Sequence, residues 1–323
     1  MSSVVLIPEP ISRPGLELLE GECECICPWA AGGSARVEDV RSQLPDADAV
    51  IVRLFTIDAD DLARAGRLKV IAKHGVGMDN IDCGAATQKG IPVVYTPDAN
   101  AVSVAEHTLT LILALARHVC PADAATRAGK FSERGRFQGT DVAGKILGIV
   151  GLGRVGSLVA EKAAAGLQMN VIGYDPVLPA EAYTGPARLA DSFETLLGSA
   201  DFLSFHVPLT PSTRHMVDAE SIAMLKPACR IINTSRGAVI DEDALVAALE
   251  RGTIAGAALD VFEDEPVPAT HPLCRTPNTL LTPHIASSTT ESLDRMSAHA
   301  AQGVLDVLHG KRPRWIVNPE VLP

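Results

Sequence analysis

Residues 146–156 read Ile-Leu-Gly-Ile-Val-Gly-Leu-Gly-Arg-Val-Gly, an apolar run that leads directly into three glycines spaced G-x-G-x-x-G. The run predicts a buried parallel strand, and the residues after it predict a helix. In such a unit Gly151 makes the tight turn, Gly153 lets a pyrophosphate approach the backbone, and Gly156 lets the helix pack against the strand. The start of the helix then offers N–H groups and a partial positive charge to phosphates.

An acidic residue follows the glycines at the distance that dinucleotide-binding folds use. Asp175 ends the next predicted strand, 175 − 156 = 19 residues after the last glycine. A carboxylate there accepts hydrogen bonds from an adenosine ribose and repels a 2′-phosphate, so it favours NAD over NADP. Another nucleotide-like ligand, such as the methyl donor S-adenosylmethionine, also binds glycine turns followed by an acid and stays open at this point.

Strands and helices alternate on both sides of this unit, which predicts an α/β protein with parallel sheets. A serine–glutamate pair, Ser103 and Glu106, is spaced as a capping box for the long central helix. Asp241 and Gly252 are expected to cap a later helix. The predicted strands are 4–7, 24–28, 49–53, 68–72, 92–95, 146–150, 171–175, 202–206, 230–234, 257–261 and 279–281, and the predicted helices include 11–20, 58–65, 103–118, 243–251 and 290–308.

Length and composition set the broad class. The chain has 323 residues, a length that predicts roughly two domains of about 150 residues each. With 47% hydrophobic and 21% charged residues it is an ordinary globular chain rather than a disordered one. A net charge of 28 − 39 = −11 argues against bulk binding to nucleic acid. The most apolar helical run, 109–116, is too short to cross a bilayer, so no membrane association is expected.

The cysteines and the chain ends bear on location. Seven cysteines are an odd number, and four of them are scattered, which favours a reducing, cytoplasmic compartment. Cys23, Cys25 and Cys27 alternate along a predicted strand and are expected to pack as small apolar side chains, with no metal site. The first residues carry no secretory leader. The chain stops at Pro323 without a further domain, so feedback regulation by serine is not expected.

Three chemistry-bearing side chains follow the ends of predicted strands in the second half: Arg236, Glu265 and His284. Because parallel α/β sheets bind ligands beyond the carboxyl ends of their strands, all three are expected near the dinucleotide. Arg236 suits a carboxylate or a 2-oxo oxygen, and His284 suits exchange of a hydroxyl proton. Glu265 would orient the histidine and favour its imidazolium form. His206, which also ends a strand, is the rival for the base.

These motifs resemble those of the D-isomer-specific 2-hydroxyacid dehydrogenases, near the D-3-phosphoglycerate dehydrogenase and hydroxypyruvate reductase branches. The resemblance runs over nearly the whole chain. It rests on the segments 73–82 (Lys-His-Gly-Val-Gly-Met-Asp-Asn-Ile-Asp), 103–106 (Ser-Val-Ala-Glu), the glycine loop, 234–237 (Thr-Ser-Arg-Gly), 260–266 (Asp-Val-Phe-Glu-Asp-Glu-Pro) and 283–284 (Pro-His).

The resemblance implies a role for each matching residue. Arg236, Glu265 and His284 form the catalytic triad, and the backbone of Val76 and Gly77 holds the substrate carboxylate. Arg53 matches a position associated with recognition of phosphoglycerate. The implied cofactor residues are Gly151, Gly153, Arg154, Val155, Gly156, Asp175, His206, Thr213, Thr234, Asp260 and Ser287.

The resemblance also implies an architecture. A Rossmann NAD-binding domain, residues 101–284, is inserted into a flavodoxin-like substrate-binding domain made of residues 1–100 and 285–323. Both are doubly wound parallel-sheet domains. The long helix from Ser103 would help to form a homodimer.

The expected activity is NAD-dependent, reversible hydride transfer to or from a small 2-hydroxy or 2-oxo acid, such as 3-phosphoglycerate or the glycerate and hydroxypyruvate pair. Two related families that catalyse other reactions can be compared with this chain at the position of Glu265. Formate dehydrogenases have Gln where this chain has Glu265, whereas phosphite dehydrogenases keep the Glu–His pair. A different class stays as the alternative: an NAD(H)-sensing binding protein, similar to the transcriptional corepressors that resemble this family.

Overall fold

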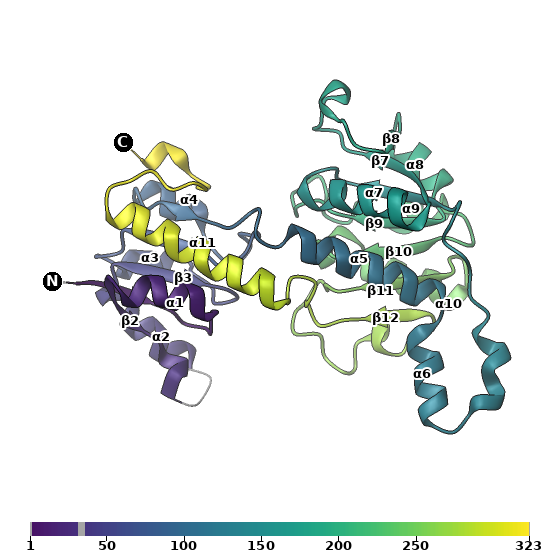
Figure 1. Ribbon diagram of the computed structural model, residues 1–323, viewed down its shortest axis with the longest axis horizontal. Helices are drawn as coiled ribbons and strands as arrows, with labels where there is room; N and C mark the ends of the chain where they lie inside the picture. The colour runs from purple at the N-terminus through teal and green to yellow at the C-terminus, as the bar shows by residue number, and fades with distance from the viewer. Residues whose placement is uncertain (1, 32–35, 323) are drawn as a thin grey trace. The chain divides into compact units, whose positions relative to one another are not determined.

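The computed structural model describes residues 2–31 and 36–322, and the chain divides into two compact units. Unit 1 comprises Met1–Asn100 and Ser288–Pro323, and unit 2 comprises Ala101–Ser287. Each unit is built on one parallel sheet (Figure 1). The prediction of two parallel-sheet α/β domains is therefore confirmed.

The sheet of unit 1 has five strands in the order β2-β1-β3-β4-β5, and every pairing is parallel. This is the flavodoxin-like order of a doubly wound sheet. Alternate residues of one strand enter different apolar clusters: Val50 and Val52 join one, and Ala49 and Ile51 join the other. The strands are β1 (Ser3–Leu6), β2 (Cys23–Ile26), β3 (Ala49–Val52), β4 (Val70–Lys73) and β5 (Val93–Val94).

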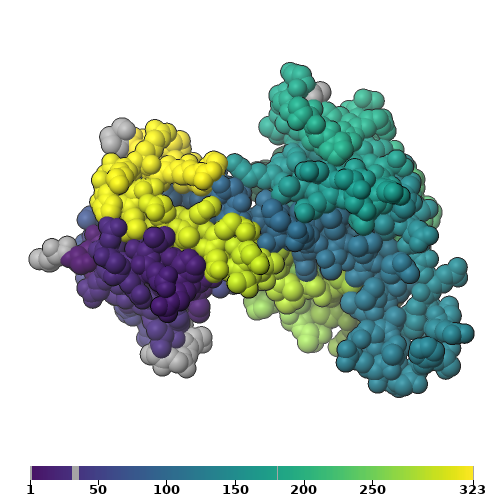
Figure 2. Space-filling model, viewed as in Figure 1, coloured from purple at the N-terminus to yellow at the C-terminus, as the bar shows by residue number. Residues whose placement is uncertain are grey.

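The two ends of the chain meet in unit 1. Helices α1 (Arg13–Glu20) and α11 (Thr290–Leu308) lie side by side (Figures 1 and 2). The Ser297 hydroxyl of α11 donates to the Ser12 carbonyl oxygen at 2.6 Å, and Val304 of α11 packs into the same cluster as β1. The other helices of the unit are α2 (Val37–Gln43), α3 (Ala59–Arg64) and α4 (Cys83–Gln88).

The sheet of unit 2 has seven strands in the order β12-β11-β10-β9-β6-β7-β8, all paired in parallel. The reversal of order at β6 is the Rossmann topology, and ligands bind at this switch point. The strands are β6 (Ile146–Val150), β7 (Asn170–Tyr174), β8 (Arg188–Leu189), β9 (Phe202–Phe205), β10 (Arg230–Asn233), β11 (Gly256–Leu259) and β12 (Thr279–Leu281), and the helices are α5 (Ala101–Ala116), α6 (Val119–Arg127), α7 (Arg154–Leu167), α8 (Phe193–Ser199), α9 (Ala219–Ala223) and α10 (Glu242–Arg251).

Two local predictions have opposite outcomes. The caps of α10 are confirmed: Asp241 accepts from the Ala244 N–H, and Gly252 takes the left-handed conformation with φ 65°. The prediction of a capping box at Ser103 is wrong, because α5 begins at Ala101 and Ser103 is already inside its first turn.

In the described part of the chain, no helix combines the length and apolarity that crossing a membrane requires.

Candidate functional site

In the glycine loop after β6, the first and last glycines are tightly packed and the central one is open. Gly151 has φ 90°, and a Cβ there would lie 2.7 Å from the His206 carbonyl oxygen. A Cβ on Gly156 would lie 1.9 Å from the Gly151 oxygen, so α7 meets the loop through bare backbone. A Cβ on Gly153 would meet nothing within 4 Å. The loop therefore leaves open space where a pyrophosphate needs to approach the backbone.

The start of α7 supplies donors beside that space. Gly153 is its N-cap, and glycine has no side chain to accept from the first N–H groups of the helix. Arg154 is exposed and Val155 half-buried in the first turn. The first N–H groups of a helix have no partner within the helix, and they carry a partial positive charge. The loop and helix start thus fit the phosphates of a dinucleotide.

Asp175 follows β7 directly and is fixed by backbone donors. One carboxylate oxygen accepts from Leu152 N–H at 2.9 Å, and the other accepts from Val177 and Leu178 N–H at 3.0 and 3.2 Å. A carboxylate has about four acceptor sites, so capacity remains for a ribose hydroxyl. The side chain is held against the glycine loop, where an adenosine ribose would need it.

His206 and Thr213 flank the loop that follows β9. The His206 ring nitrogen Nε2 lies 2.9 Å from the Ser204 hydroxyl, and desolvation lowers the pKa of His206 to about 3. The Thr213 hydroxyl donates to the Pro208 carbonyl oxygen at 2.7 Å and accepts from Thr210 N–H at 2.8 Å. His206 is therefore neutral at physiological pH, and Thr213 shapes the turn beside it.

Asp260, just after β11, organises the segment that carries His284. Its carboxylate is fully buried and accepts from the Thr282 hydroxyl at 2.6 Å and from Ile285 and Ala286 N–H at 2.9 and 2.8 Å. Burial alone would raise the pKa of Asp260, but hydrogen bonds, led by those from His107 and Thr282, lower it. These bonds tie residues 285 and 286 to unit 2. The division between the units accordingly falls at Ser287 rather than at 284.

Two further predicted cofactor residues lie nearby in the same unit. Thr234, after β10, is buried, and its hydroxyl lies 3.0 Å from the Thr108 hydroxyl of α5. Ser287 is half-buried in the turn after Ala286.

His284 and Glu265 form a direct pair. Nδ1 of His284 lies 2.7 Å from Oε2 of Glu265, and Oε1 of Glu265 accepts from Phe262 N–H at 3.0 Å. Desolvation raises the pKa of the Glu265 carboxyl group, but the bonds from His284 and Phe262 outweigh it and lower the pKa. The two side chains are 43% and 34% exposed, so solvent and small molecules reach them. With Nδ1 bound to the carboxylate, Nε2 is left for proton transfer.

The backbone at His284 is unusual. It has φ 52°, a left-handed conformation that non-glycine residues rarely adopt. The His284 N–H donates to the Asp260 carbonyl oxygen at 2.8 Å, which helps to hold this geometry. Such strained residues concentrate at functional sites.

Arg236 follows β10 and is half-buried. Its guanidinium donates to the Ser235 carbonyl oxygen at 2.7 Å, and its own carbonyl oxygen accepts from the Asn233 side-chain amide at 2.8 Å. Arg236, Glu265 and His284 thus all follow carboxyl ends of strands in the Rossmann sheet.

In unit 1 the predicted substrate residues lie after β3 and β4. The Gly75 N–H donates to the Thr96 hydroxyl at 3.1 Å, which orders the turn before Val76 and Gly77. The Val76 side chain is 39% exposed. The Arg53 guanidinium donates to the Pro10 carbonyl oxygen at 3.1 Å.

Glu9 is a residue that the sequence interpretation missed. Its carboxylate accepts from three successive backbone N–H groups, those of Arg53, Leu54 and Phe55, at 2.7, 2.9 and 3.0 Å. It therefore shapes the loop that presents Arg53. The signal was an acid between two prolines immediately after a strand, Pro8-Glu9-Pro10. Across the described residues, no cluster of three or more His, Cys, Asp or Glu side chains suits a metal ion.

Comparison with known proteins agrees with this geometry. Residues 109–286 match the family described as "D-isomer specific 2-hydroxyacid dehydrogenase, NAD binding domain". The chain is 38% identical to a glyoxylate reductase of Thermofilum pendens, with 98% of this chain and 95% of that protein covered. A crystal structure of a protein from Thermus thermophilus superposes with a TM-score of 0.89 at 36% identity, covering 97% of this chain and 99% of that one.

The chain belongs to the D-isomer-specific 2-hydroxyacid dehydrogenase family, and unit 2 contains its NAD-binding domain. The predicted family and the predicted type of cofactor-binding domain are confirmed. The chain is also 42% identical to D-3-phosphoglycerate dehydrogenase of Methanocaldococcus jannaschii over 99% of its own length. It spans 60% of the length of that relative.

Proposed function

We propose that this chain is an NAD-dependent dehydrogenase that interconverts a small 2-hydroxy acid and the corresponding 2-oxo acid. The observation that carries the proposal is the hydrogen-bonded pair of His284 and Glu265, at 2.7 Å, beyond the end of β12 in a dinucleotide-binding sheet. Oxidising a 2-hydroxy acid removes a proton from the hydroxyl group and a hydride from C2. Bound NAD supplies the hydride acceptor, so the protein has to manage the proton and the carboxylate.

The residues divide that work. Nε2 of His284 takes the hydroxyl proton during oxidation and returns it during reduction. Glu265 fixes the ring through Nδ1 and stabilises the imidazolium that forms. Arg236 pairs with the substrate carboxylate or the 2-oxo oxygen through its planar guanidinium.

Unit 1 is assigned as the substrate-binding domain and unit 2 as the cofactor-binding domain. The backbone amides of Val76 and Gly77 hold the substrate carboxylate, and Arg53 contacts the distal part of the substrate. In unit 2 the glycine loop would hold the phosphates of NAD, and Asp175 would bind its adenosine ribose. The remaining cofactor contacts are assigned to Arg154, Val155, His206, Thr213, Thr234, Asp260 and Ser287.

The test is a steady-state assay of NADH oxidation with glyoxylate, hydroxypyruvate and 3-phosphohydroxypyruvate, together with the reverse reactions. We expect turnover with at least one acid and a strong preference for NADH over NADPH. His284→Ala should lose turnover and keep NADH binding. Tight NADH binding without turnover of any 2-oxo acid would refute the dehydrogenase and favour an NAD(H)-sensing binding protein.

We further infer a homodimer. Several large apolar side chains on or after α5 are exposed: Val102 at 45%, Leu113 at 37%, Val119 at 52% and Phe131 at 68%. An open groove of about 590 Å³ runs along α5 and α7, lined by Leu109, Leu113 and Leu167 among others. Exposed apolar side chains beside an open groove are the features on which this inference of association rests. Sedimentation equilibrium should give twice the chain mass, and a monomer at all concentrations would refute the inference.

A reducing compartment, the cytoplasm, is the location that the thiols favour. All seven cysteines are free. Burial is the largest cause that raises the pKa of the Cys25 thiol, to about 11, which disfavours its reactive thiolate.

A further inference from the structure

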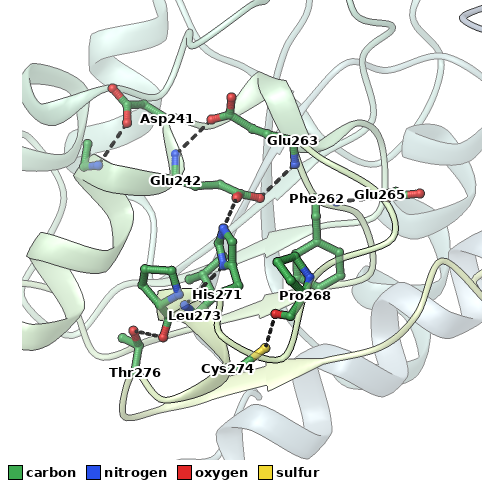
Figure 3. Close-up of polar contacts among 12 residues, drawn as sticks. Asp241, Glu242, Phe262, Glu263, Glu265, Pro268, His271, Leu273, Cys274 and Thr276 are labelled. Carbon is green, nitrogen blue, oxygen red and sulfur yellow. Dashed lines mark hydrogen bonds and ion pairs between the residues drawn. The ribbon is translucent and has the colours of Figure 1, made fainter.

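Two acidic side chains bind one another's backbone beside the loop that carries Glu265. The Glu242 carboxylate accepts from the Glu263 N–H at 2.9 Å, and the Glu263 carboxylate accepts from the Glu242 N–H at 3.2 Å (Figure 3). Glu242 is the first residue of α10 and is only 7% exposed. The reciprocal pair therefore connects a buried helix start to the loop after β11.

A histidine lies close to each of the two carboxylates. Nε2 of His271 lies 3.1 Å from Oε2 of Glu242 (Figure 3), and Nε2 of His215 lies 3.1 Å from Oε1 of Glu263. Nδ1 of His271 accepts from Leu273 N–H at 3.3 Å, which orients the ring with Nε2 toward Glu242. Both oxygens of Glu242 are thus engaged, one by the loop and one by His271.

The loop reaches the catalytic pair within three residues of this contact. A Cβ on Gly237 would lie 1.8 Å from the Phe262 carbonyl carbon, so the loop packs directly on backbone there. The next N–H along the chain from this packed point, that of Glu263, is the one bound by Glu242. The Phe262 N–H donates to Oε1 of Glu265, whose Oε2 binds His284. The Phe262 and Glu263 N–H groups belong to consecutive peptides, so fixing the second peptide constrains the direction of the first and, through it, the Glu265 carboxylate.

We propose that Glu242 is a positioning residue for the Glu265–His284 pair. By accepting the Glu263 N–H, it fixes the backbone that aims the Phe262 N–H at Glu265. Glu265 then holds the His284 ring with Nε2 available. A turnover readout of this role rests on the proposed dehydrogenase function.

The test compares Glu242→Ala with Glu242→Gln and with Asp241→Ala. The alanine variant removes the acceptor, whereas the glutamine variant keeps an oxygen in its place. Asp241→Ala is the matched control, because it removes the N-cap of the same helix and leaves the bond to Glu263 intact. Turnover of the preferred 2-oxo acid, the Kd for NADH and the nitrogen resonances of His284, assigned with His284→Ala, are measured in each.

In Glu242→Ala we expect kcat to fall by about tenfold to a hundredfold, the scale of a 1 Å misplacement, with the Kd for NADH unchanged. The His284 resonances should change from one fixed tautomer to a mixture. Glu242→Gln should restore both the rate and the spectrum, and Asp241→Ala should keep them while losing stability.

The proposal is overturned if Glu242→Ala retains the wild-type kcat and His284 spectrum, or if Asp241→Ala lowers kcat equally. Should the alanine variant fail to fold, Glu242→Asp, one methylene shorter, carries the same expectations. If the wild-type protein turns over no 2-oxo acid, the proposed function fails. The His284 spectra of the variants still decide the role of Glu242.

Discussion

Acidification should destabilise unit 1 through one buried histidine. His74, directly after β4, is 5% exposed. Desolvation, followed by the positive charges of Arg53 and Lys73, lowers its pKa to about 4. In the unfolded chain a histidine has a pKa of about 6.5. At mildly acidic pH, His74 is therefore protonated in the unfolded state but remains neutral in the native state.

The sign and size follow from this difference in pKa. The native value lies below the unfolded one, so stability is intact above about pH 6.5 and is lost as the pH falls toward about 4. Between about pH 7.5 and about pH 5, linkage gives a loss of about 2 kcal/mol from this residue. With a urea m-value of roughly 2 kcal/mol/M, the unfolding midpoint should fall by about 1 M.

The chain offers a selective assay for this effect. It has two tryptophans, Trp29 and Trp315, and both lie in unit 1, as does His74. Tryptophan fluorescence during urea unfolding therefore reports on unit 1. His74→Leu removes the titrating group, so its pH dependence should be flatter than that of the wild type by about 2 kcal/mol. Identical pH dependence in the two proteins would refute the reasoning.

Three further outcomes are expected. Gly156→Ala places a Cβ 1.9 Å from the Gly151 oxygen, so it should cost about 1–3 kcal/mol in calorimetry and weaken NADH binding in a fluorescence titration. Asp175→Ala should lower the NAD-over-NADP ratio of kcat/KM by about tenfold or more, and an unchanged ratio would contradict the ribose contact. Glu9→Ala removes the acceptor of three N–H groups and should destabilise unit 1 by about 1–3 kcal/mol in urea unfolding; the exposed neighbour Pro10→Ala serves as control.

The sequence predicted the regular parts of the fold because their signals are local. The bounds of β6, β12 and α11 agree with the predicted ranges 146–150, 279–281 and 290–308. Strand β8 was missed, since two residues, Arg188 and Leu189, are too few to show a period. The start of α5 was placed two residues late, because Ser103 offered a plausible cap within a helix that already extends to Ala101.

In the candidate site, too, the sequence predicts the features with local signals and misses the others. That Glu265 and His284 follow neighbouring strand ends could be inferred from the strand pattern. The contacts of Glu9 and Glu242 could not, because they join positions 44 and 21 residues apart through side chain and backbone. Such a hydrogen bond depends on the tertiary arrangement of two distant segments, and no periodicity or spacing in the sequence predicts it.

The choice between two histidines shows what the structure adds to a motif. His206 and His284 both follow the carboxyl end of a strand, so position alone leaves either as the base. An acid–base group must change its charge near the working pH. Desolvation lowers the pKa of His206 to about 3, so its ring, which is hydrogen-bonded to the Ser204 hydroxyl, is uncharged. His284 is partly exposed, and its Nδ1 lies 2.7 Å from the Glu265 carboxylate, so its surroundings, more than its place in the chain, support it as the proposed base.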